Sequence, residues 1–411
     1  MKNVIKMSLA SAMFMNVVTV YAQVDTEISI FDNVKVNGEI RPRYEFVDQD
    51  NVLSNANALT NRLTLGVNAD LFATHWLSAY VEMTDVHNVN NNYNSTDNGE
   101  VGHSTVVDPE QTRVTQSYLD FKYNKSKLRA GRQMINLDNQ RFVGAVGWRQ
   151  MPQTFDAWTL TDSSVENLDL FVSYMTQTNT VRAGNTDSKD SETLIFNGRY
   201  KLMDELTVTG YGYLVSQGVT GNDSSDTYGV SLTGNTAIDA VKIDYRLEYA
   251  KMTDASLEVT NVGKADHDSD YFNLTLGANI SGILAGVGYE VLGADKEAGV
   301  SAFYTPLATL HAFNGWADIF LASTPVDGLE DISLMAGYKS KDFGLLKAIY
   351  HDFSAEQGGT DYGTELDILY TRAIPAVKGL TGVLKYADYN ADALNVDTQK
   401  FWVMLDYKFS N

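Results

Sequence analysis

The sequence predicts an all-β fold: a transmembrane antiparallel β-barrel of about eighteen strands in a single domain. Three observations predict it. Segments of roughly 9 to 14 residues alternate apolar and polar side chains, as strands with two unlike faces do. The links between the segments are short and long in turn. After the N-terminal leader, no stretch is long and apolar enough for a transmembrane helix. Strands of this kind share no common core. In a closed barrel in lipid, the apolar faces contact the acyl chains and the polar faces surround a water-filled lumen.

Residues 1–22 are expected to be a secretory signal peptide. A weakly basic start is followed by the apolar stretch 7–20, and Val20 and Ala22 occupy the −3 and −1 positions of a plausible cleavage site. The barrel is then expected to comprise residues 23–411. The chain contains no cysteine, which excludes both a disulfide scaffold and a Cys-ligated metal site.

The strand pattern is clearest at 34–46 (VKVNGEIRPRYEF), and 62–71 and 241–249 repeat it. One face of each is apolar, and the other carries charges of both signs, as the wall of a water-filled lumen does. Tyr and Phe gather near strand ends, where membrane barrels carry aromatic girdles. The expected strands are 33–47, 60–72, 75–85, 112–124, 126–133, 154–162, 167–177, 191–202, 204–217, 225–236, 239–252, 269–280, 282–292, 330–340, 343–354, 361–374, 379–390 and 398–409.

The alternating link lengths predict an even number of strands. In bacterial barrels the short turns lie in the periplasm with both termini, and the long loops lie outside. The segment 311–320 (HAFNGWADIF) also resembles a strand, but a nineteenth strand would break this parity. We therefore expect it to lie within a long external link, 293–329.

Two links differ from ordinary barrel loops. MINLDNQRFVGAVGWRQMPQ (134–153) leads into TFDAWTL (154–160), and PLATLHAFNGWADIF occupies 306–320. The first holds Arg, Trp, Gly and amide side chains, and the second holds Trp, Gly and Asn. Such residues let a loop fold inward and hydrogen-bond to a lumen wall. Long structured loops often carry function. We therefore expect structured, functional loops near 134–153 and 293–329.

These motifs resemble the alginate-export family of outer-membrane porins. The resemblance rests on GRQ, RFVG, GWRQ and QTFDA around the first link and on HAFNGWAD in the second, and the barrel pattern extends it over nearly the whole mature chain. It implies an eighteen-stranded monomeric barrel in the outer membrane of a Gram-negative bacterium, with an arginine-lined pore for an anionic polyuronate. By position within the motifs, it implies constriction or loop-bracing roles for Arg132, Arg141, Arg149 and Asp156. The loop-motif residues are Trp148, His311, Asn314, Trp316 and Asp318.

Alternation alone places further cations on the lumenal face. They are Arg41, Arg43, Arg62, Arg129, Arg199, Lys242 and Arg246. Arginine binds carboxylates bidentately and stays charged, so rings of such residues make a path for anions. Glu39, Glu45, Asp244 and Glu248 are expected to orient them. The expected function is an outer-membrane channel for anionic solutes, namely acidic polysaccharide or sugar acids. For each residue the alternative is a lumenal ion-pair ladder without selectivity.

Two other functions remain open: a general diffusion porin with weak selectivity, and a surface or adhesive barrel. The net charge of −21 disfavours nucleic-acid binding. Much of the acid lies in the links, at 187–192, 223–226 and 266–270. These segments form either a solvated surface or a site for divalent-cation bridges to lipopolysaccharide.

We expect neither an enzyme nor a cofactor. The six histidines lack metal-ligand spacing, and no nucleophile elbow or phosphate-binding loop is present. The expected partners are outer-membrane lipids and lipopolysaccharide, an anionic small solute or polysaccharide, and the barrel-assembly machinery. The machinery is expected to recognise the amphipathic last strand, 400–409, through its terminal Phe409.

Overall fold

The computed structural model describes residues 29–218, 223–259, 263–295, 302–321 and 323–411. The expected signal peptide lies outside the described residues. The described chain forms eighteen strands and two single 3₁₀ turns, η2 (Gly184–Thr186) and η3 (Leu310–Ala312). The strands are β1 (Phe31–Gln49), β2 (Ala56–Leu71), β3 (Leu77–Asn88), β4 (Gln111–Tyr123), β5 (Ser126–Gln133), β6 (Thr154–Asp162), β7 (Leu168–Asn179), β8 (Ser188–Met203), β9 (Leu206–Gln217), β10 (Asp223–Ile238), β11 (Val241–Val259), β12 (Gly263–Ile280), β13 (Ile283–Leu292), β14 (Leu329–Ser340), β15 (Gly344–Ser354), β16 (Asp361–Ala373), β17 (Leu380–Ala391) and β18 (Thr398–Ser410).

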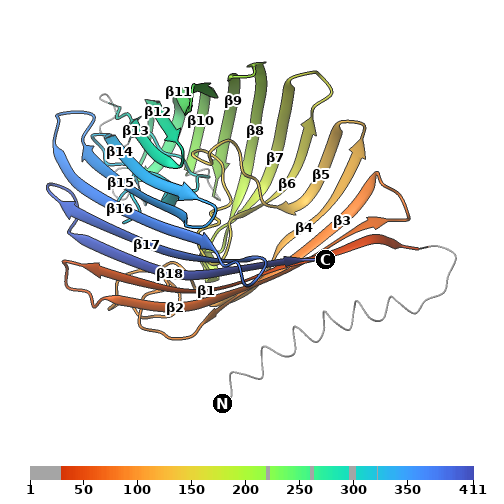
Figure 1. Ribbon diagram of the computed structural model, residues 1–411, viewed down its shortest axis with the longest axis horizontal. Coiled ribbons are helices and arrows are strands. Elements are labelled where there is room, and N and C mark those ends of the chain that lie inside the picture. Colours follow the sequence, from red (N-terminus) through yellow and green to blue (C-terminus); the bar gives the residue numbers. More distant parts are fainter. Residues whose placement is uncertain (1–28, 219–222, 260–262, 296–301, 322) are drawn as a thin grey trace.

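The strands close into one antiparallel barrel (Figure 1). Each strand pairs with its neighbours in sequence, and β1 pairs with both β2 and β18. Arg41 stands opposite Arg62 on one side of β1, and Tyr44 stands opposite Val403 on the other. Because closure leaves no edge, the backbone groups of every strand are paired without water, as a lipid environment requires.

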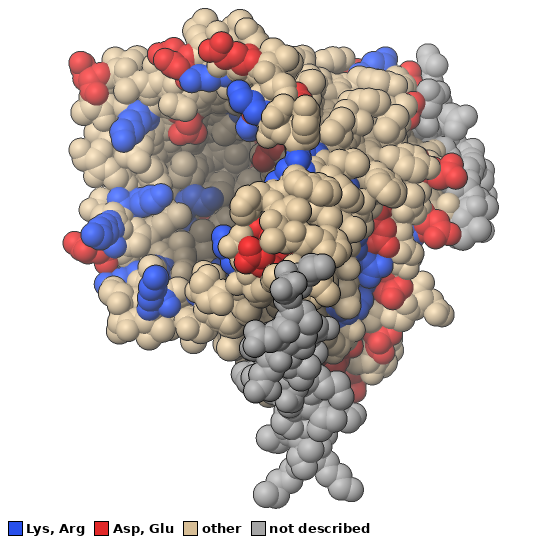
Figure 2. All heavy atoms as spheres, turned by 90° about the vertical axis from the view of Figure 1, so that its right-hand side faces the viewer, with Lys and Arg blue, Asp and Glu red and all other residues tan. Residues whose placement is uncertain are grey.

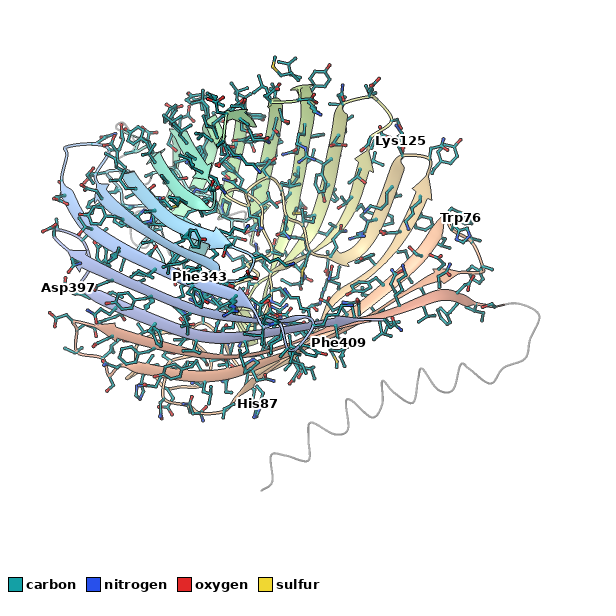
Figure 3. The ribbon with its side chains drawn as sticks, in the orientation of Figure 1. Trp76, His87, Lys125, Phe343, Asp397 and Phe409 are labelled. Atoms are coloured by element: carbon teal, nitrogen blue, oxygen red, sulfur yellow. The ribbon has the colours of Figure 1, made fainter. Side chains whose placement is uncertain are left out.

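Short and long links lie at opposite ends of the barrel. In Figure 3, Trp76 and Lys125, which belong to two short links, lie at one end, and Asp397 of the last long link lies at the other. The β4–β5 link is a two-residue turn in which Asn124 adopts a φ of 52°, a left-handed conformation that Asn tolerates. The eighteen-strand prediction is therefore confirmed. The segment 311–320 forms no strand and lies in the β13–β14 link, as expected.

Apolar side chains cover the outside of the barrel. Leu247, Leu274 and Ile332 are 40, 45 and 53% exposed, whereas Glu248, the next residue along β11, is 1% exposed on the lumenal face. This inverts the arrangement of a soluble protein, because lipid is the solvent for the outer face. Within the described ranges, no helix has the length and apolar character to cross a membrane.

The apolar core lies inside the barrel rather than between layers. The β5–β6 link, 134–153, and residues 302–321 of the β13–β14 link run into the interior, where Figure 1 shows coil within the ring of strands. Their buried side chains pack with wall residues in one cluster, which includes Phe142, Leu307, Trp316, Phe320, Phe353 and Trp402. Two long links thus fill part of the lumen.

Candidate pore constriction

Arg41 on β1 holds the β5–β6 link through backbone carbonyls. Its guanidinium donates to the carbonyl oxygens of Gly147, at 2.9 Å, and Arg149, at 2.6 Å. It also donates to the Gln150 side chain, at 3.1 Å. A guanidinium presents five donors in a fixed fork, so one buried side chain can fix several points of a loop. Arg41 is therefore a brace for this link, and little of it faces solvent.

Arg43, two residues along the same lumenal face, joins a third link to this arrangement. It donates to the carbonyl oxygen of Trp148, at 2.5 Å, and pairs with Asp108 of the β3–β4 link. The other carboxylate oxygen of Asp108 accepts from the Gln150 backbone N–H at 2.7 Å. Both side chains of the pair are fully buried. The β3–β4 and β5–β6 links are thus bound to the same arginine on β1.

Arg149 joins the two inward links to each other and to the wall. Its guanidinium lies 3.3 Å from Glu45 of β1 and 3.2 Å from Asp318 of the β13–β14 link. Asp108 lies 3.8 Å away. Burial alone would lower the pKa of Arg149, but the three carboxylates outweigh it and raise the pKa. The guanidinium therefore stays charged, and its charge is compensated inside the constriction.

Arg141 fixes the tip of the β13–β14 link. It pairs with Glu290 of β13 at 2.9 Å and donates to the Asn314 side-chain oxygen at 3.0 Å. The Phe313 ring lies 4.9 Å from the guanidinium carbon. Asn314 in turn donates to Glu290, at 2.6 Å. Burial alone would lower the pKa of Arg141, but Glu290 and Tyr271 together outweigh it and raise the pKa. Phe313 and Asn314 are therefore held at a defined depth in the lumen.

His311 and Asp318 form a second hydrogen-bonded chain. Asp318 accepts from His311 Nδ1 at 2.5 Å and from Lys400 of β18 at 2.9 Å, and the Lys385 ammonium of β17 donates to His311 Nε2 at 2.6 Å. Burial lowers the pKa of His311 to about 3, against the opposing effect of Asp318. Burial alone would raise the pKa of Asp318, but His311, Lys400 and Arg149 hold it well below its ordinary value. The histidine is therefore neutral and the aspartate ionised.

Two acidic residues of β16 hold the rest of this loop motif. The backbone N–H of Trp316 donates to Asp367 at 3.1 Å, and that of Ala317 donates to Glu365 at 2.7 Å. The Lys385 ammonium lies 3.8 Å from the Trp316 ring centroid, a cation–π contact. The segment 310–318, which we call the inner segment, is thus tied to the wall by backbone and side-chain contacts.

Two hollows lie on either side of the inner segment. One is lined by Tyr304 and by Leu292 and Leu329 at the long-link ends of β13 and β14. The other is lined by residues deeper in the strands, among them Ser333 and Lys347. Phe313 and Asn314 line both hollows. The inner segment therefore separates the two hollows, which makes it the candidate constriction of the lumen.

The structure places Arg132 and Asp156 elsewhere. They pair with each other at 2.7 Å across β5 and β6, on the strand face that also carries the exposed Leu128 and Trp158. This is the outer face of the barrel, so the expected place of this pair at the constriction is corrected. The reason is the alternation of side chains along a strand. Arg132 lies three residues after the lumenal Arg129, and residues an odd number of positions apart point to opposite faces.

The other predicted cations lie on the lumenal wall. Four of them form ion pairs, and one does not. Arg62 pairs with Glu39 at 3.0 Å, Arg129 with Asp120 at 2.7 Å, Arg246 with Glu248 at 2.7 Å and Arg199 with Asp169 at 3.2 Å. Lys242 has no ion pair among the described residues. Figure 2 shows the barrel from the end where Trp76 and Lys125 lie, with Lys and Arg gathered around a hollow.

Sequence reasoning missed several residues of the constriction. Asp108 lies in a link without any recognisable pattern, and Glu290, Lys385 and Lys400 are ordinary lumenal residues of their strands. One signal was present in the sequence. Trp402 falls on the polar face of the last strand, and a large aromatic side chain facing the lumen indicates that something packs there. In the structure Trp402 is fully buried against Trp148 and His311.

A closed eighteen-stranded barrel with an apolar exterior and inward links that narrow its lumen defines an outer-membrane channel. The chain belongs to the alginate export family, which matches residues 32–289. Its members are channels of the Gram-negative outer membrane and are not enzymes. Among the described residues, no group of three or more His, Asp or Glu side chains could hold a metal ion.

Solved structures with this fold are outer-membrane proteins of low sequence identity. OccK8 (OprE) of Pseudomonas aeruginosa matches with a TM-score of 0.72 at 15% identity, over 93% of this chain and 99% of that one. OccAB4 of Acinetobacter baumannii matches with a TM-score of 0.70 at 14% identity, over 93% and 99% of the two chains. OpdK of Pseudomonas aeruginosa, solved with vanillate, matches with a TM-score of 0.72 at 13% identity, over 93% and 100%. No curated protein matches the chain.

Proposed function

We propose that this channel passes small anionic solutes that carry carboxylates, such as sugar acids or segments of acidic polysaccharide, by diffusion. One observation carries the proposal. Lys122 of β4 and Lys127 of β5 are direct cross-strand partners on the lumenal face. Neither has an ion-pair partner within the described part of the chain. Like charges directly opposite each other destabilise a sheet, so their presence on a solvated wall favours a role in attracting anions.

The buried arginines hold the links that narrow the lumen, and their own charges are compensated. Arg41, Arg43, Arg141 and Arg149 are buried and compensated by carbonyls or carboxylates. A solute therefore meets the uncompensated lysines, including Lys242, and not these arginines. The arginines set the width of the passage, and the lysines set its charge.

A structural neighbour accommodates a ligand of this chemical class. OpdK was solved with vanillate, which is a small carboxylate. At 13% identity the likeness extends to the fold alone, so it supports only the compatibility of this barrel with such a solute.

Reversal potentials in planar bilayers test the proposal. Under a KCl gradient, the wild-type channel is expected to prefer chloride over potassium. Lys122→Gln with Lys127→Gln should shift the reversal potential towards zero. Lys341→Gln with Lys378→Gln, which removes two exposed lysines from short links, is the matched control and should shift it less. A wild-type potential near zero would instead support a general diffusion porin, and the absence of conductance would support a surface or adhesive barrel.

A further inference from the structure

Two acidic residues of β16 lie side by side beneath the inner segment. Glu365 and Asp367 are two positions apart in one strand, so both side chains point into the lumen. Both residues are 0% exposed. Acidic side chains are almost never fully buried unless they are paired. Among the described residues, no lysine or arginine lies within ion-pair distance of either carboxyl group. Their burial therefore depends on something other than a salt bridge.

The hydrogen bonds of the two carboxyl groups show what is missing. Each group uses one oxygen to accept a backbone N–H of the inner segment, that of Trp316 at Asp367 and that of Ala317 at Glu365. The other two oxygens are buried and receive no donor from any other described residue. The two carboxyl groups are hydrogen-bonded to each other. Because a carboxylate has no donor, this bond requires a proton on one of the two groups.

The inner segment approaches the two carboxyl groups most closely at Gly315. This residue has a φ of 81°, a left-handed conformation that favours glycine, and a β-carbon there would clash with Oε2 of Glu365. The backbone of the inner segment thus lies directly on the carboxyl group. Because both acidic side chains are fully buried beneath it, water reaches them only if the segment moves.

The nearest group that can carry a positive charge is a histidine. His351 of β15 stands opposite Glu365, and its Nε2 lies 3.7 Å from Asp367. Its Nδ1 bonds to Asp331 of β14 at 2.8 Å. Histidine loses its charge as the pH rises, so His351 compensates the two acidic groups least in alkaline solution.

The lysines of the neighbouring strands are directed elsewhere. Lys347 of β15 and Lys385 of β17 both stand opposite Leu369, two residues beyond Asp367. Their ammonium groups lie 5.4 and 3.8 Å from the centroid of the Trp316 ring. The other titratable groups on the surrounding elements bond to partners outside the two carboxyl groups; they are His311, Asp318 and Tyr389.

We propose that Glu365 and Asp367 share one proton at neutral pH, and that this acid pair is the positioning element that keeps the inner segment across the lumen. With the proton in place, the pair carries a single negative charge and accepts two backbone N–H groups. When hydroxide removes the proton, two adjacent buried carboxylates repel each other and must be hydrated, which displaces the segment. The constriction therefore widens in alkaline solution. This goes beyond the proposed function, because it holds whichever solute the channel passes.

Single-channel conductance in KCl, measured from neutral to alkaline pH, tests the positioning role. Glu365→Gln replaces the shared proton by a permanent amide donor and keeps an oxygen for the Ala317 N–H. Its conductance should not show the alkaline rise, and Asp367→Asn should behave in the same way. Lumenal lysines titrate equally in all channels, so the wild type should rise relative to these variants at the same pH. Asp244→Asn is the matched control. It removes a lumenal carboxylate that has no ion pair among the described residues, and it should retain the rise.

Infrared spectroscopy detects the proton directly and does not depend on conductance. At neutral pH the wild type should show the carbonyl stretch of a protonated carboxyl group. Glu365→Gln and Asp367→Asn should each lose this band, because the amide then supplies the donor and the remaining carboxyl group ionises. Asp244→Asn should keep it. A band of equal intensity in the wild type and in both pair variants would overturn the shared proton.

The conductance has its own contrary outcomes. An alkaline rise that persists in Glu365→Gln and Asp367→Asn would overturn the positioning role and assign the response to Lys347 and Lys385, whose loss of charge would free the Trp316 ring. A wild type that does not rise relative to the variants would overturn it as well. Neither result alters the reversal potential under a KCl gradient at neutral pH, which tests the proposed function separately.

Discussion

The Trp148 indole stacks on the His311 imidazole, with ring centroids 4.7 Å apart and planes 10° from parallel. Trp148 belongs to the β5–β6 link and His311 to the β13–β14 link, which approach from opposite parts of the barrel. Trp402 of β18 meets both rings edge-on, at 5.8 and 5.7 Å. The two inward links are thus packed as one unit against the wall. The constriction is expected to respond as a unit to changes at this contact.

Acid should destabilise the protein through His311. Its pKa is about 3 in the folded state, against about 6.5 in an unfolded chain. Between these values the unfolded state binds the extra proton, so the free energy of unfolding falls by about 1.4 kcal/mol for each unit that the pH drops. The pKa of Asp318 is also lowered. Its stabilising contribution is lost only when the pH falls below the pKa of aspartate in the unfolded chain. The slope from pH 6.5 to 4 therefore reports on the histidine.

Thermal unfolding in detergent micelles, followed by circular dichroism across this pH range, checks the prediction. His311→Asn retains a donor for Asp318 but removes the titrating ring, so it should show a shallower slope. Identical slopes in the variant and the wild type would contradict the assignment.

Arg149→Met should destabilise the protein by about 3–5 kcal/mol, because it leaves Glu45, Asp108 and Asp318 buried without their common cation. Arg199→Met is the matched control. It removes an ion pair with exposed side chains and should cost no more than about 1 kcal/mol. Thermal unfolding and protease cleavage within 134–153 measure both effects. Similar losses in the two variants would argue against Arg149 as the link between the loops.

Arg141→Ala should widen the constriction. Without the guanidinium, Phe313 and Asn314 lose their shared anchor, so single-channel conductance should rise and fluctuate more. Arg246→Ala also breaks a lumenal pair with a glutamate, Glu248, and among the described residues Arg246 makes no hydrogen bond or ion pair with either inward link. It should change the conductance less. If both variants conduct as the wild type does, another part of the lumen limits the current.

Arg132→Ala should leave ion selectivity unchanged, because Arg132 pairs with Asp156 on the outer face of the barrel. Lys127→Gln, a change of the same charge on the lumenal face of the same strand, should lower anion preference. Reversal potentials of the two variants under one KCl gradient make the comparison. A larger shift for Arg132→Ala would contradict the placement of these two side chains.

Much of the fold could be predicted because the signals are local. Alternation marks each strand and its two faces, and link length separates the two ends of the barrel. The same parity placed 311–320 in a loop, where the structure has it. The roles of single arginines could not be predicted this way. The family resemblance implies a constriction or loop-bracing role for Arg141, and alternation places Arg129 on the lumenal face. In the structure Arg141 anchors a loop to β13, and Arg129 pairs within its own hairpin.

The sequence by itself determined the barrel: the number of strands, the lipid-facing and lumenal residues and the two unusual links. Only the tertiary structure decided which charges are neutralised and which stay available. Alternation assigns a side chain to a face, but its partner depends on the path of loops that cross the lumen from distant parts of the chain. Arg149 therefore meets Asp318, while Lys122 and Lys127 stand opposite each other without a carboxylate partner in the described part of the chain.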